Sequence, residues 1–301
     1  MLPIIKLRGH LHNSFGKSAS AVTIISIDQT HQKGIEFEAF CLAINEEYEK
    51  KNLVKLTIVE TGYLKRHYLR LDKSYSSTSE ADLAAIRLGE NWVKEQLSSL
   101  YSLKVPVEIL SWKDIIESQI GEEDKPFTDY LSKIENDYTS DSIFINHVNT
   151  ISEKYAEKIA VKYNPNGLKA LNEACLKAAR DYLLEESSII FKLVHRGFSY
   201  QLYPGNRNAA LRYIAKKYFR EINPIPWVRY DIKYPSDIKE KKLNPSPSLF
   251  FENADVSSQE TKNKITELLS SLLNEEKISF LTEQLNKSEP SIRISHERDI
   301  K

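Results

Sequence analysis

Two serines near the N-terminus are candidate nucleophiles in this chain of 301 residues. Ser18 ends the triplet Gly16-Lys17-Ser18, which resembles the end of a phosphate-binding loop, whereas Ser26 follows the apolar run AVTII. A phosphate-binding loop needs a further glycine where Leu11 stands, and it follows a strand and opens a helix. The triplet instead precedes a predicted strand, so we interpret it as a polar turn. Ser26, whose hydroxyl can attack an acyl group, is the stronger candidate.

No complete motif for a hydrolase, a metal site or a nucleotide-activating enzyme accompanies Ser26. The Gly-x-Ser-x-Gly sequence of many serine hydrolases is absent, although His31 follows closely and could act as a base. His10 and His12 are spaced for two metal ligands, but the sequence places no third ligand. The chain also lacks the His-x-Gly-His and Lys-x-Ser-Lys-Ser sequences of class I aminoacyl-tRNA synthetases. We therefore expect neither a metal nor a cofactor, and a serine acyl-hydrolase of a small ester is kept as an alternative.

Further along the chain, two short motifs carry tyrosine and carboxylate side chains. Tyr182 and Glu186, in the run RDYLLEESS, are spaced to lie on one face of a helix. Tyr203-Pro204-Gly205 follows a strand-like run. A carboxylate can hold an ammonium group and accept its proton, and a phenol can donate a hydrogen bond. Each motif alone is common on exposed helices and in turns, so its function depends on what else lies nearby.

Strand-like and helical patterns alternate over the first part of the chain. Apolar runs rich in β-branched residues predict strands, and apolar residues at helical spacing predict helices. The predicted strands span residues 21–27, 53–61 and 105–112, and the predicted helices span 34–52 and 79–102. Such alternation is typical of a parallel sheet with helices on both faces. We predict an α/β, Rossmann-like fold with Ser26 at the carboxyl end of the first strand, where such folds bind ligands.

The middle of the chain is predicted to be mainly helical, and the C-terminal part to be an extension. Helical patterns cover residues 126–137, 141–163, 167–191 and 206–221, and strand-like runs cover 189–196 and 198–203. From about residue 235 the composition becomes that of a linker, followed by one helical pattern at 262–285. We therefore place a domain that holds the candidate site at 1–240, and a linker, helix and polar tail at 241–301.

Composition narrows the class of protein and its location. Lys and Arg number 42 and equal the 42 Asp and Glu, so only a local basic face could bind nucleic acid. Cys41 and Cys175 lie far apart without metal-ligand spacing, which predicts buried, reduced thiols. The sequence shows neither a signal-peptide apolar region nor the ~18 apolar residues of a membrane span. We expect a monomeric, cytoplasmic protein that does not contact membranes.

In their order along the chain, these residues resemble the tRNA-dependent cyclodipeptide synthases. The resemblance rests on Ser26, on Tyr182 with Glu186, and on Tyr203-Pro204-Gly205, and it covers roughly residues 20 to 220. Tyr203-Pro204 is similar to the Tyr-Pro branch of that family, and we prefer it to Tyr200-Gln201, which is similar to the Tyr-Gln branch.

Two positions around Ser26 bear on this assignment. Gln29 stands where the Tyr-Gln branch has asparagine and where the Tyr-Pro branch varies, and the following HQKG resembles the polar turn of the family. Ile24 departs from the pattern, because the family usually has glycine at this position. If the alignment is correct, Ile24 makes the wall of the first aminoacyl pocket bulkier.

The resemblance implies an activity and a role for each residue. Members of this family join two aminoacyl groups from aminoacyl-tRNAs into a cyclic dipeptide without ATP, on a fold similar to class I synthetase catalytic domains. Ser26 would carry the aminoacyl group of the first substrate in a ping-pong reaction, Glu186 and Tyr182 would handle the amino group, and Tyr203 would shape and polarise the site. Ile24, Gln29 and Pro204 would contact substrate. A non-catalytic tRNA-binding module on the same frame is a further alternative.

Two basic clusters are candidate tRNA-binding faces, and the sequence leaves the choice between them open. The first lies in the helical pattern 206–221 and comprises Arg207, Arg212, Lys216, Lys217 and Arg220. The second comprises Lys65, Arg66, Arg70 and Lys73, interleaved with Tyr63, Tyr68 and Tyr75. The family has a basic helix before its third strand, but here the predicted helix 79–102 carries only Arg87 and Lys94 beside Glu90 and Glu95.

Overall fold

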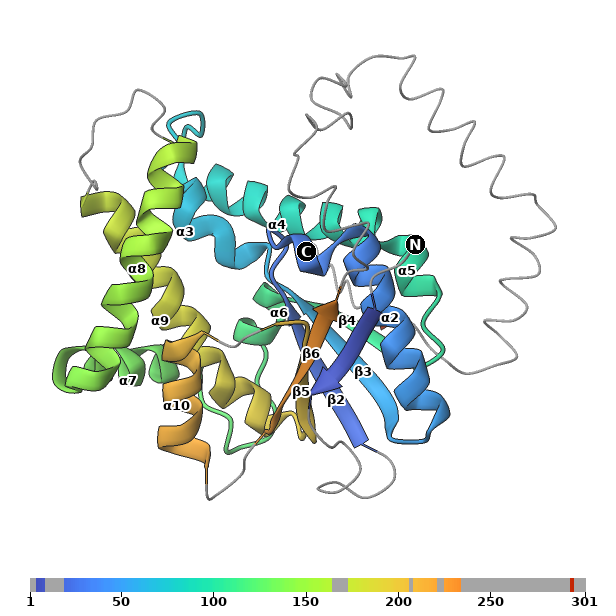
Figure 1. Ribbon diagram of the computed structural model, residues 1–301. Helices are drawn as coiled ribbons and strands as arrows, with labels where there is room; N and C mark the ends of the chain where they lie inside the picture. The colour runs from blue at the N-terminus through green and yellow to red at the C-terminus, as the bar shows by residue number, and fades with distance from the viewer. Residues whose placement is uncertain are drawn as a thin grey trace, which may run out of the picture.

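The computed structural model describes residues 4–8, 19–163, 173–205, 208–220, 225–233 and 293–294. Within these residues one seven-stranded sheet has the strand order β1-β6-β5-β2-β3-β4-β7 (Figure 1). All neighbouring strands run parallel except β1, which pairs antiparallel with β6 at one edge. The strands are β1 Ile4–Arg8, β2 Ala19–Ile25, β3 Leu53–Glu60, β4 Val107–Ser111, β5 Tyr200–Tyr203, β6 Trp227–Lys233 and β7 Arg293–Ile294.

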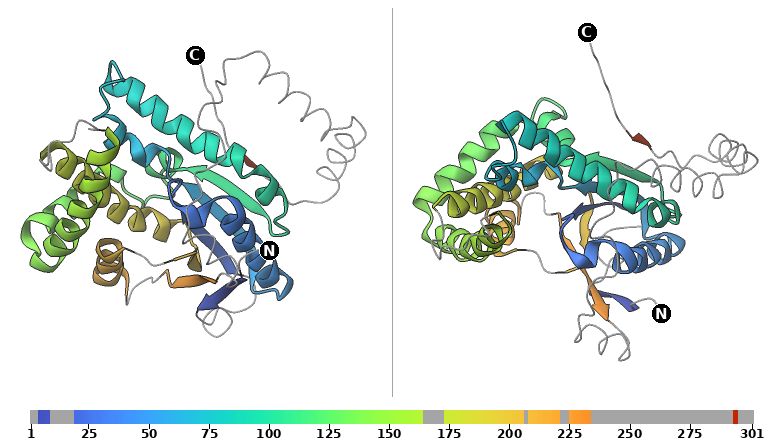
Figure 2. Two further views of the ribbon diagram at one scale, coloured as in Figure 1. Left: turned by 45° about the horizontal axis from the view of Figure 1, so that its top comes forward. Right: turned by 90° about the horizontal axis from the view of Figure 1, so that it is seen from above.

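Helices cover both faces of this sheet, as the two further views show (Figure 2). One face is covered by α2 Gly34–Glu49, α4 Thr78–Glu95 and α5 Leu97–Tyr101. The other is covered by α6 Trp112–Glu117, α7 Phe127–Ser140, α8 Ser142–Tyr163, α9 Glu173–His195 and α10 Ala209–Phe219. Three short helices, η1 Thr30–Gln32, η2 Tyr63–Lys65 and α3 Arg66–Leu69, follow strand ends. The predicted α/β architecture is confirmed.

The alternation of side chains along β2 creates two separate cores. Val22 and Ile24 pack into the cluster formed with α6 to α10, whereas Ala21 and Ile25 pack into the cluster formed with α2, α4 and α5. Successive residues of a strand point to opposite faces, so a strand buried on both faces is apolar throughout. This explains why the run 21–27 is continuously apolar, and it places the residues after β2 between the two helical layers.

The helix α4 approaches the end of β3 unusually closely at Gly89. A Cβ atom at Gly89 would overlap the carboxyl group of Glu60, and one at Gly62 would lie 2.4 Å from the Gly89 nitrogen. The Glu60 carboxyl is buried and accepts a hydrogen bond from Gly62 N at 2.6 Å. Glycine inside a helix costs about 1 kcal/mol relative to alanine, and here the close approach requires it.

Two predicted elements were wrong in their type or extent. The run 189–196 was predicted to be strand-like, but α9 continues through it to His195. Ile189, Ile190 and Leu193 are almost fully buried there between several elements, and a helix buried on all sides has no polar stripe to reveal its period. The predicted helix 79–102 is interrupted at Gln96, whose side-chain oxygen accepts a hydrogen bond from Gly34 N at 2.9 Å.

Some elements of the structure were not predicted, and some predicted features lie outside the described residues. The strands β1 and β6 and the short helix α6 were not predicted. The triplet Gly16-Lys17-Ser18, the pair His10 and His12, and most of the predicted tail 241–301 lie outside the described residues. Beyond residue 240 the described residues are Arg293–Ile294, which form β7 beside β4.

Two predictions from composition concern the described residues directly. Cys41 and Cys175 are both buried and unpaired with each other, as predicted. In the part of the chain that the structure describes, no helix combines the length and the apolar character needed to cross a membrane.

Candidate active site

Ser26 lies immediately after β2, at the edge where the parallel strands end. Its backbone N–H donates a hydrogen bond to Gln32 Oε1, and its carbonyl accepts one from Gln29 N at 2.9 Å. These two bonds close the turn between β2 and η1. Gln32, the last residue of η1, is fully buried, so its side chain holds the Ser26 backbone in place. Ser26 is half-buried and lines two cavities, which is the location expected for a ligand site in such a fold.

The first cavity brings together the four residues that the sequence singled out as catalytic. Ser26 from the end of β2, Tyr182 and Glu186 from α9, and Tyr203 from β5 all line a space of about 170 Å³. The rest of the lining is Ile24, Gln29, His31, Thr61, Tyr155, Gln201, Asn208, Leu211 and Trp227. Ile24 and Gln29 are thus at the cavity, whereas Pro204 is buried and does not contribute to this lining.

Glu186 is half-buried in the first cavity, and the acidity of its carboxyl group is strongly altered. Burial raises the pKa of Glu186 to about 7, against the opposing effects of the Lys65 charge and of a hydrogen bond from Asn208. Asn208 Nδ2 donates that bond to Glu186 Oε2 at 2.7 Å, while Asn208 Oδ1 accepts from Leu211 N and caps the start of α10. Near neutral pH the carboxyl can therefore gain and lose a proton, which suits an acid or base.

Tyr182 lies in a stack of tyrosine rings. Its ring is parallel to that of Tyr68 at a centroid distance of 4.9 Å, and it meets Tyr155 edge-on at 5.9 Å. Burial, followed by the nearby Glu186 charge, raises the pKa of the Tyr182 and Tyr155 hydroxyls well above the ordinary value. Both hydroxyls are therefore protonated at physiological pH and can donate hydrogen bonds into the cavity that they line.

Tyr203 is fixed by aromatic neighbours and by the turn that follows β5. Its ring lies 4.9 Å from Trp227 and 6.0 Å from His31, centroid to centroid. Burial raises the pKa of Tyr203 to about 12, and the Glu186 charge acts in the same direction. Gly205 has φ of 142°, and a Cβ there would lie 3.2 Å from the Tyr203 ring, so the turn requires glycine.

The structure also separates Tyr203 from the alternative pair at 200 and 201. Tyr200 is fully buried on the α2 side of the sheet, where its hydroxyl donates to Asn52 O at 2.9 Å. Gln201 and Tyr203 are two residues apart on β5 and both line the first cavity. The strand period therefore places Tyr203, rather than Tyr200, at the site.

A second cavity of about 240 Å³ also reaches Ser26. It shares with the first cavity the residues Ser26, Gln29, Tyr155 and Tyr182. Its remaining lining is Asp28, Lys65, Tyr68, Leu88, Lys158 and Ile159. Ser26 and Tyr182 therefore line two spaces, each large enough to receive a small group.

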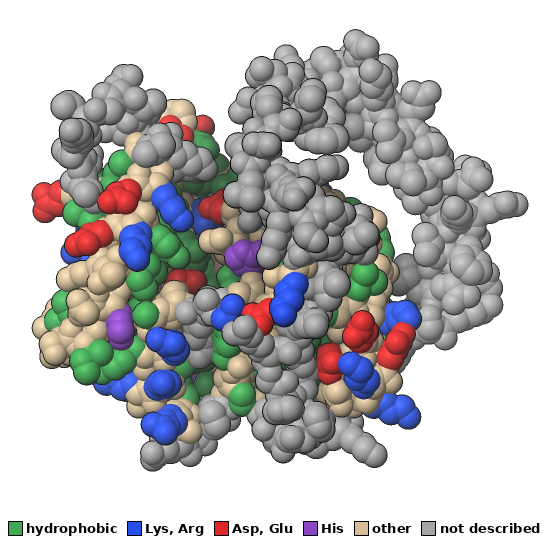
Figure 3. Space-filling model, viewed as in Figure 1, with side chains coloured by type: hydrophobic (Ala, Val, Ile, Leu, Met, Phe, Trp, Pro, Cys, Tyr) green, Lys and Arg blue, Asp and Glu red, His purple; other side chains and the backbone are tan. Residues whose placement is uncertain are grey.

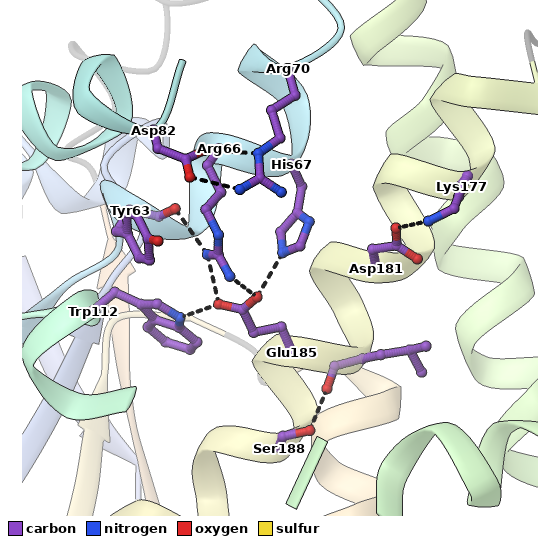
Figure 4. Close-up of polar contacts among 11 residues, drawn as sticks. Tyr63, Arg66, His67, Arg70, Asp82, Trp112, Lys177, Asp181, Glu185 and Ser188 are labelled. Atoms are coloured by element: carbon purple, nitrogen blue, oxygen red, sulfur yellow. Dashed lines mark hydrogen bonds and ion pairs between the residues drawn. The ribbon is translucent and has the colours of Figure 1, made fainter. Parts of the chain in front are cut away.

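Beside Glu186, the neighbouring Glu185 anchors α9 to the rest of the protein (Figure 4). Its carboxylate accepts hydrogen bonds from Arg66 Nη1 at 2.8 Å, His67 Nε2 at 2.7 Å and Trp112 Nε1 at 2.7 Å, and Arg66 Nη2 completes a two-point contact. Although burial opposes it, hydrogen bonds from His67 and Arg66 lower the pKa of Glu185 to about 2. The network ties α9 to α3 and α6, and so fixes the helix that carries Tyr182 and Glu186.

The second predicted basic cluster is not an open cationic surface. Lys65 is buried and pairs with Asp28 at 2.6 Å, and Arg66 is held by Glu185. Arg70 makes a two-point contact with Asp82, with Nη2 at 2.7 Å from Oδ2. Each of these three cations is neutralised by a carboxylate. Among the described residues, Lys73 is the one member of the cluster that is exposed and has no carboxylate within ion-pair distance.

The basic residues of α10 remain on the surface. Arg212, Lys216 and Arg220 are exposed, and Lys and Arg side chains gather over α10 at the lower left of Figure 3. Lys217 contacts Asp137 at 2.9 Å and Asp141 at 2.8 Å, so its charge is largely compensated. Arg207 lies outside the described residues.

Several lining residues were not identified from the sequence. Gln201 shares a strand face with Tyr203, so the strand period could have revealed it. Tyr155, Asn208, Trp227 and Lys65 come from elements whose approach to Ser26 no local pattern encodes. Among the described residues, no group of three or more His, Cys, Asp or Glu side chains is arranged to hold a metal ion.

Comparison with proteins of known structure identifies the fold. The chain is 19% identical to a cyclodipeptide synthase (CDPS) from Fluoribacter dumoffii, with a TM-score of 0.66 over 78% of this chain and 100% of that one. It is 25% identical to a cyclodipeptide synthase from Candidatus Glomeribacter gigasporarum bound to Phe-tRNAPhe, with a TM-score of 0.61 over 81% and 97%. A cyclodipeptide synthase from Bacillus thermoamylovorans is 13% identical, with a TM-score of 0.52 over 78% and 97%. No family model and no curated protein matches the chain. The chain therefore has the fold that these cyclodipeptide synthases share.

Proposed function

We propose that this protein is a tRNA-dependent cyclodipeptide synthase, which joins two aminoacyl groups from aminoacyl-tRNAs into a 2,5-diketopiperazine. The observation that carries the proposal is the meeting of Ser26, Tyr182, Glu186 and Tyr203, from three elements, around one cavity. Support comes from the shared fold and from the related synthase that binds Phe-tRNAPhe. Tyr203-Pro204, with Gln29 after Ser26, favours the Tyr-Pro branch of the family.

In the first half-reaction Ser26 takes the aminoacyl group from one substrate. The Ser26 hydroxyl attacks the ester carbonyl, the bond to the ribose oxygen breaks, and the serine proton passes to that ribose hydroxyl. The tRNA leaves, and an aminoacyl-serine ester remains. An aminoacyl ester is already activated, so no ATP is consumed and a serine without a complete triad suffices.

In the second half-reaction the amine of the serine-bound group attacks the ester of the second aminoacyl-tRNA. An amide bond forms, the second tRNA leaves with the proton, and a dipeptidyl-serine results. The new terminal amine then attacks the Ser26 ester, which closes the ring and returns the proton to the serine. Two cavities that meet at Ser26 suit this sequence, because both aminoacyl groups must be near the same hydroxyl.

Glu186 and the tyrosines supply the proton transfers and the polar contacts. An α-ammonium group must lose a proton before it can attack, and the Glu186 carboxylate is positioned to hold it and accept that proton. Tyr182 lies one helical turn earlier on the same cavity wall and donates a hydrogen bond, while Tyr203 polarises the reacting carbonyl. Each hydrogen bond made only in the transition state would contribute ~2–4 kcal/mol.

The same geometry supports candidates for the substrate contacts and for the tRNA contact. Ile24 and Gln29 line the first cavity, and Pro204 is buried directly after Tyr203. The exposed cations of α10 provide the basic face for the tRNA, since the cluster around Lys65 is neutralised.

Mass spectrometry of cyclic dipeptides in cultures that express the protein tests this function. Wild-type cultures should contain a diketopiperazine that disappears with Ser26→Ala, and purified wild-type protein should gain one aminoacyl mass with aminoacyl-tRNA. Ser20→Ala, on the same strand but away from both cavities, is the matched control and should retain the product.

Other outcomes would point elsewhere. Release of free acid from a small ester without tRNA would indicate a hydrolase. Equal binding of charged and uncharged tRNA, with no covalent adduct, would indicate a binding module. Either result would overturn the proposed function.

A further inference from the structure

Lys65 is a buried cation at the candidate site, although the sequence places it in a basic run. Its side chain is only 8% exposed, and its Nζ lies 2.6 Å from Asp28 Oδ2. The partner is 55% exposed, so the lysine is the buried member of the pair. Burying an ammonium group costs several kcal/mol unless it is well compensated. A lysine that only stabilised the fold could reach solvent instead, so its burial calls for another explanation.

The surroundings of Lys65 belong to the acyl-transfer site. Its Nζ lies 5.2 Å from the centroid of the Tyr182 ring and 5.6 Å from that of Tyr68, within the range of cation–π attraction. Its carboxylate partner is Asp28, two residues after Ser26 in the turn that follows β2. Lys65 thus connects the serine turn to the helix that carries Tyr182 and Glu186, and it lines the second cavity.

Lys65 also acts on the charge of Glu186. The groups that face this carboxyl are Asn208 at the start of α10 and the neutral hydroxyls of Tyr155, Tyr182 and Tyr203. His31 lines the same cavity, and burial lowers the pKa of its imidazole. Among the described residues, Lys65 is the cation whose charge lowers the Glu186 pKa against the effect of burial.

We propose that Lys65 is a positioning residue, which holds the Ser26 turn against the Tyr182 helix and favours the charged form of Glu186. The role rests on the proposed function, because a charged Glu186 is what binds the α-ammonium group and accepts its proton. Without Lys65, burial would leave Glu186 mostly protonated at neutral pH, and the attacking amine would lose its base.

The test compares Lys65→Met and Lys65→Arg with the wild type. Lys65→Met should move the acidic limb of the pH–rate profile for product formation upward by about one pH unit, so activity well below the midpoint falls about tenfold and recovers at higher pH. Lys65→Arg keeps the charge and should keep the midpoint. Lys154→Met, at an exposed site on α8, is the matched control and should leave the profile unchanged.

A second variant should shift the acidic midpoint in the opposite direction, and its substitution lies at an exposed residue. Asp28→Asn removes the partner of Lys65 at an exposed position, so the lysine charge acts on Glu186 without compensation and the acidic midpoint should fall. Carboxyl 13C NMR titration, with Glu186→Gln to assign the signal, follows the same shifts without any turnover. An unchanged Glu186 titration in folded Lys65→Met and Asp28→Asn proteins would overturn the proposal.

The design separates this proposal from the function on which it rests. If wild-type protein formed neither product nor aminoacyl-enzyme at any pH, the proposed function would fail, and the role of Lys65 in that reaction with it. The NMR titration would still show whether Lys65 sets the Glu186 charge. If product forms but neither the pH profile nor the titration moves, only the role of Lys65 is wrong.

Discussion

At the scale of single residues, Glu186 is a half-buried carboxyl group in the cavity that must ionise to act as a base. Burial raises its pKa to about 7, and one hydrogen bond from Asn208 and the charge of Lys65 only partly compensate. Such a carboxyl destabilises the fold whenever it is charged, so its presence is better explained by chemistry than by stability.

Glu186→Gln should therefore inactivate the protein and stabilise it. The folded pKa is above the ordinary value of 4.5, so the stability from the neutral carboxyl is complete below pH 4.5 and is lost as pH rises through about 7. At pH 8 the variant should exceed the wild type by roughly 2–3 kcal/mol in free energy of unfolding, and at pH 4.5 by much less. Urea denaturation at both pH values measures this. Glu157→Gln, at an exposed site on α8, should show no such pH dependence.

Ile24 is a second residue with a testable role, because its side chain limits the size of the first cavity. It is 5% exposed and lines the first cavity, at the position where the family usually has glycine. Ile24→Ala should enlarge the cavity and shift the products toward larger side chains, at a cost of about 2–4 kcal/mol in stability. Ile25→Ala, on the opposite face of β2, should cost a similar amount without changing the products. Unchanged products in Ile24→Ala, measured by mass spectrometry, would mean that Ile24 does not limit the substrate.

At the scale of elements, α9 is the helix that organises the site. It carries Tyr182 and Glu186 toward the cavities and Glu185 toward α3 and α6, where four donors satisfy one carboxylate (Figure 4). Consecutive residues of a helix point in different directions, so two adjacent glutamates serve separate purposes. Glu185 is held charged by its hydrogen-bond partners, whereas Glu186 can gain and lose a proton near neutral pH.

Removing the charge of Glu185 should loosen this helix. Glu185→Gln leaves the largely enclosed Arg66, whose side chain is 12% exposed, without its counter-ion, which should cost about 3–5 kcal/mol in free energy of unfolding at pH 7. The Glu185 pKa is lowered in the fold, so the stability it provides is present above pH 4.5 and is lost as pH falls through about 2. Asp181→Asn breaks the exposed pair with Lys177 on the same helix and should cost under about 1 kcal/mol. Equal costs for the two variants would contradict the anchoring role.

At the scale of the whole molecule, the surface is hollowed between α8–α10 and the sheet, and basic side chains gather over α10 (Figure 3). The overall charge is zero, so attraction to tRNA depends on where the cations lie. All the lining residues of both cavities lie between Ile24 and Trp227. We therefore propose that residues 1–240 carry the complete site.

Replacing Arg212, Lys216 and Arg220 together with Ala should weaken tRNA binding. Each lost phosphate contact should reduce the slope of log affinity against log salt by about one, so the slope should fall by up to about three. Binding measured between low and physiological salt tests this. Substitution of the exposed Lys50, Lys51 and Lys104 serves as the control for charge alone. Equal losses in both triple variants would remove α10 as the tRNA-binding face.

Much of the site could be predicted, because its parts are local. The position of Ser26 at a strand end and the four-residue spacing of Tyr182 and Glu186 are visible in the sequence. In the structure these three residues line one cavity. The boundary of α9 could not be predicted, because burial on every side removes the polar face that marks a helix. Asn208 and Tyr155 could not be predicted either, since their approach to Glu186 depends on how separate helices pack.

The sequence by itself determined the alternating strands and helices and the candidate catalytic residues, because hydrophobic periodicity and short-range spacing are properties of neighbouring residues. Only the tertiary structure decided which charges are buried. Lys65 and Arg66 belong to one basic run, yet one is paired with Asp28 and the other with Glu185, which is 119 residues away. Burial of a charge depends on partners that the fold supplies, and so Lys65, from a run that resembled a tRNA-binding surface, lies buried beside the candidate site.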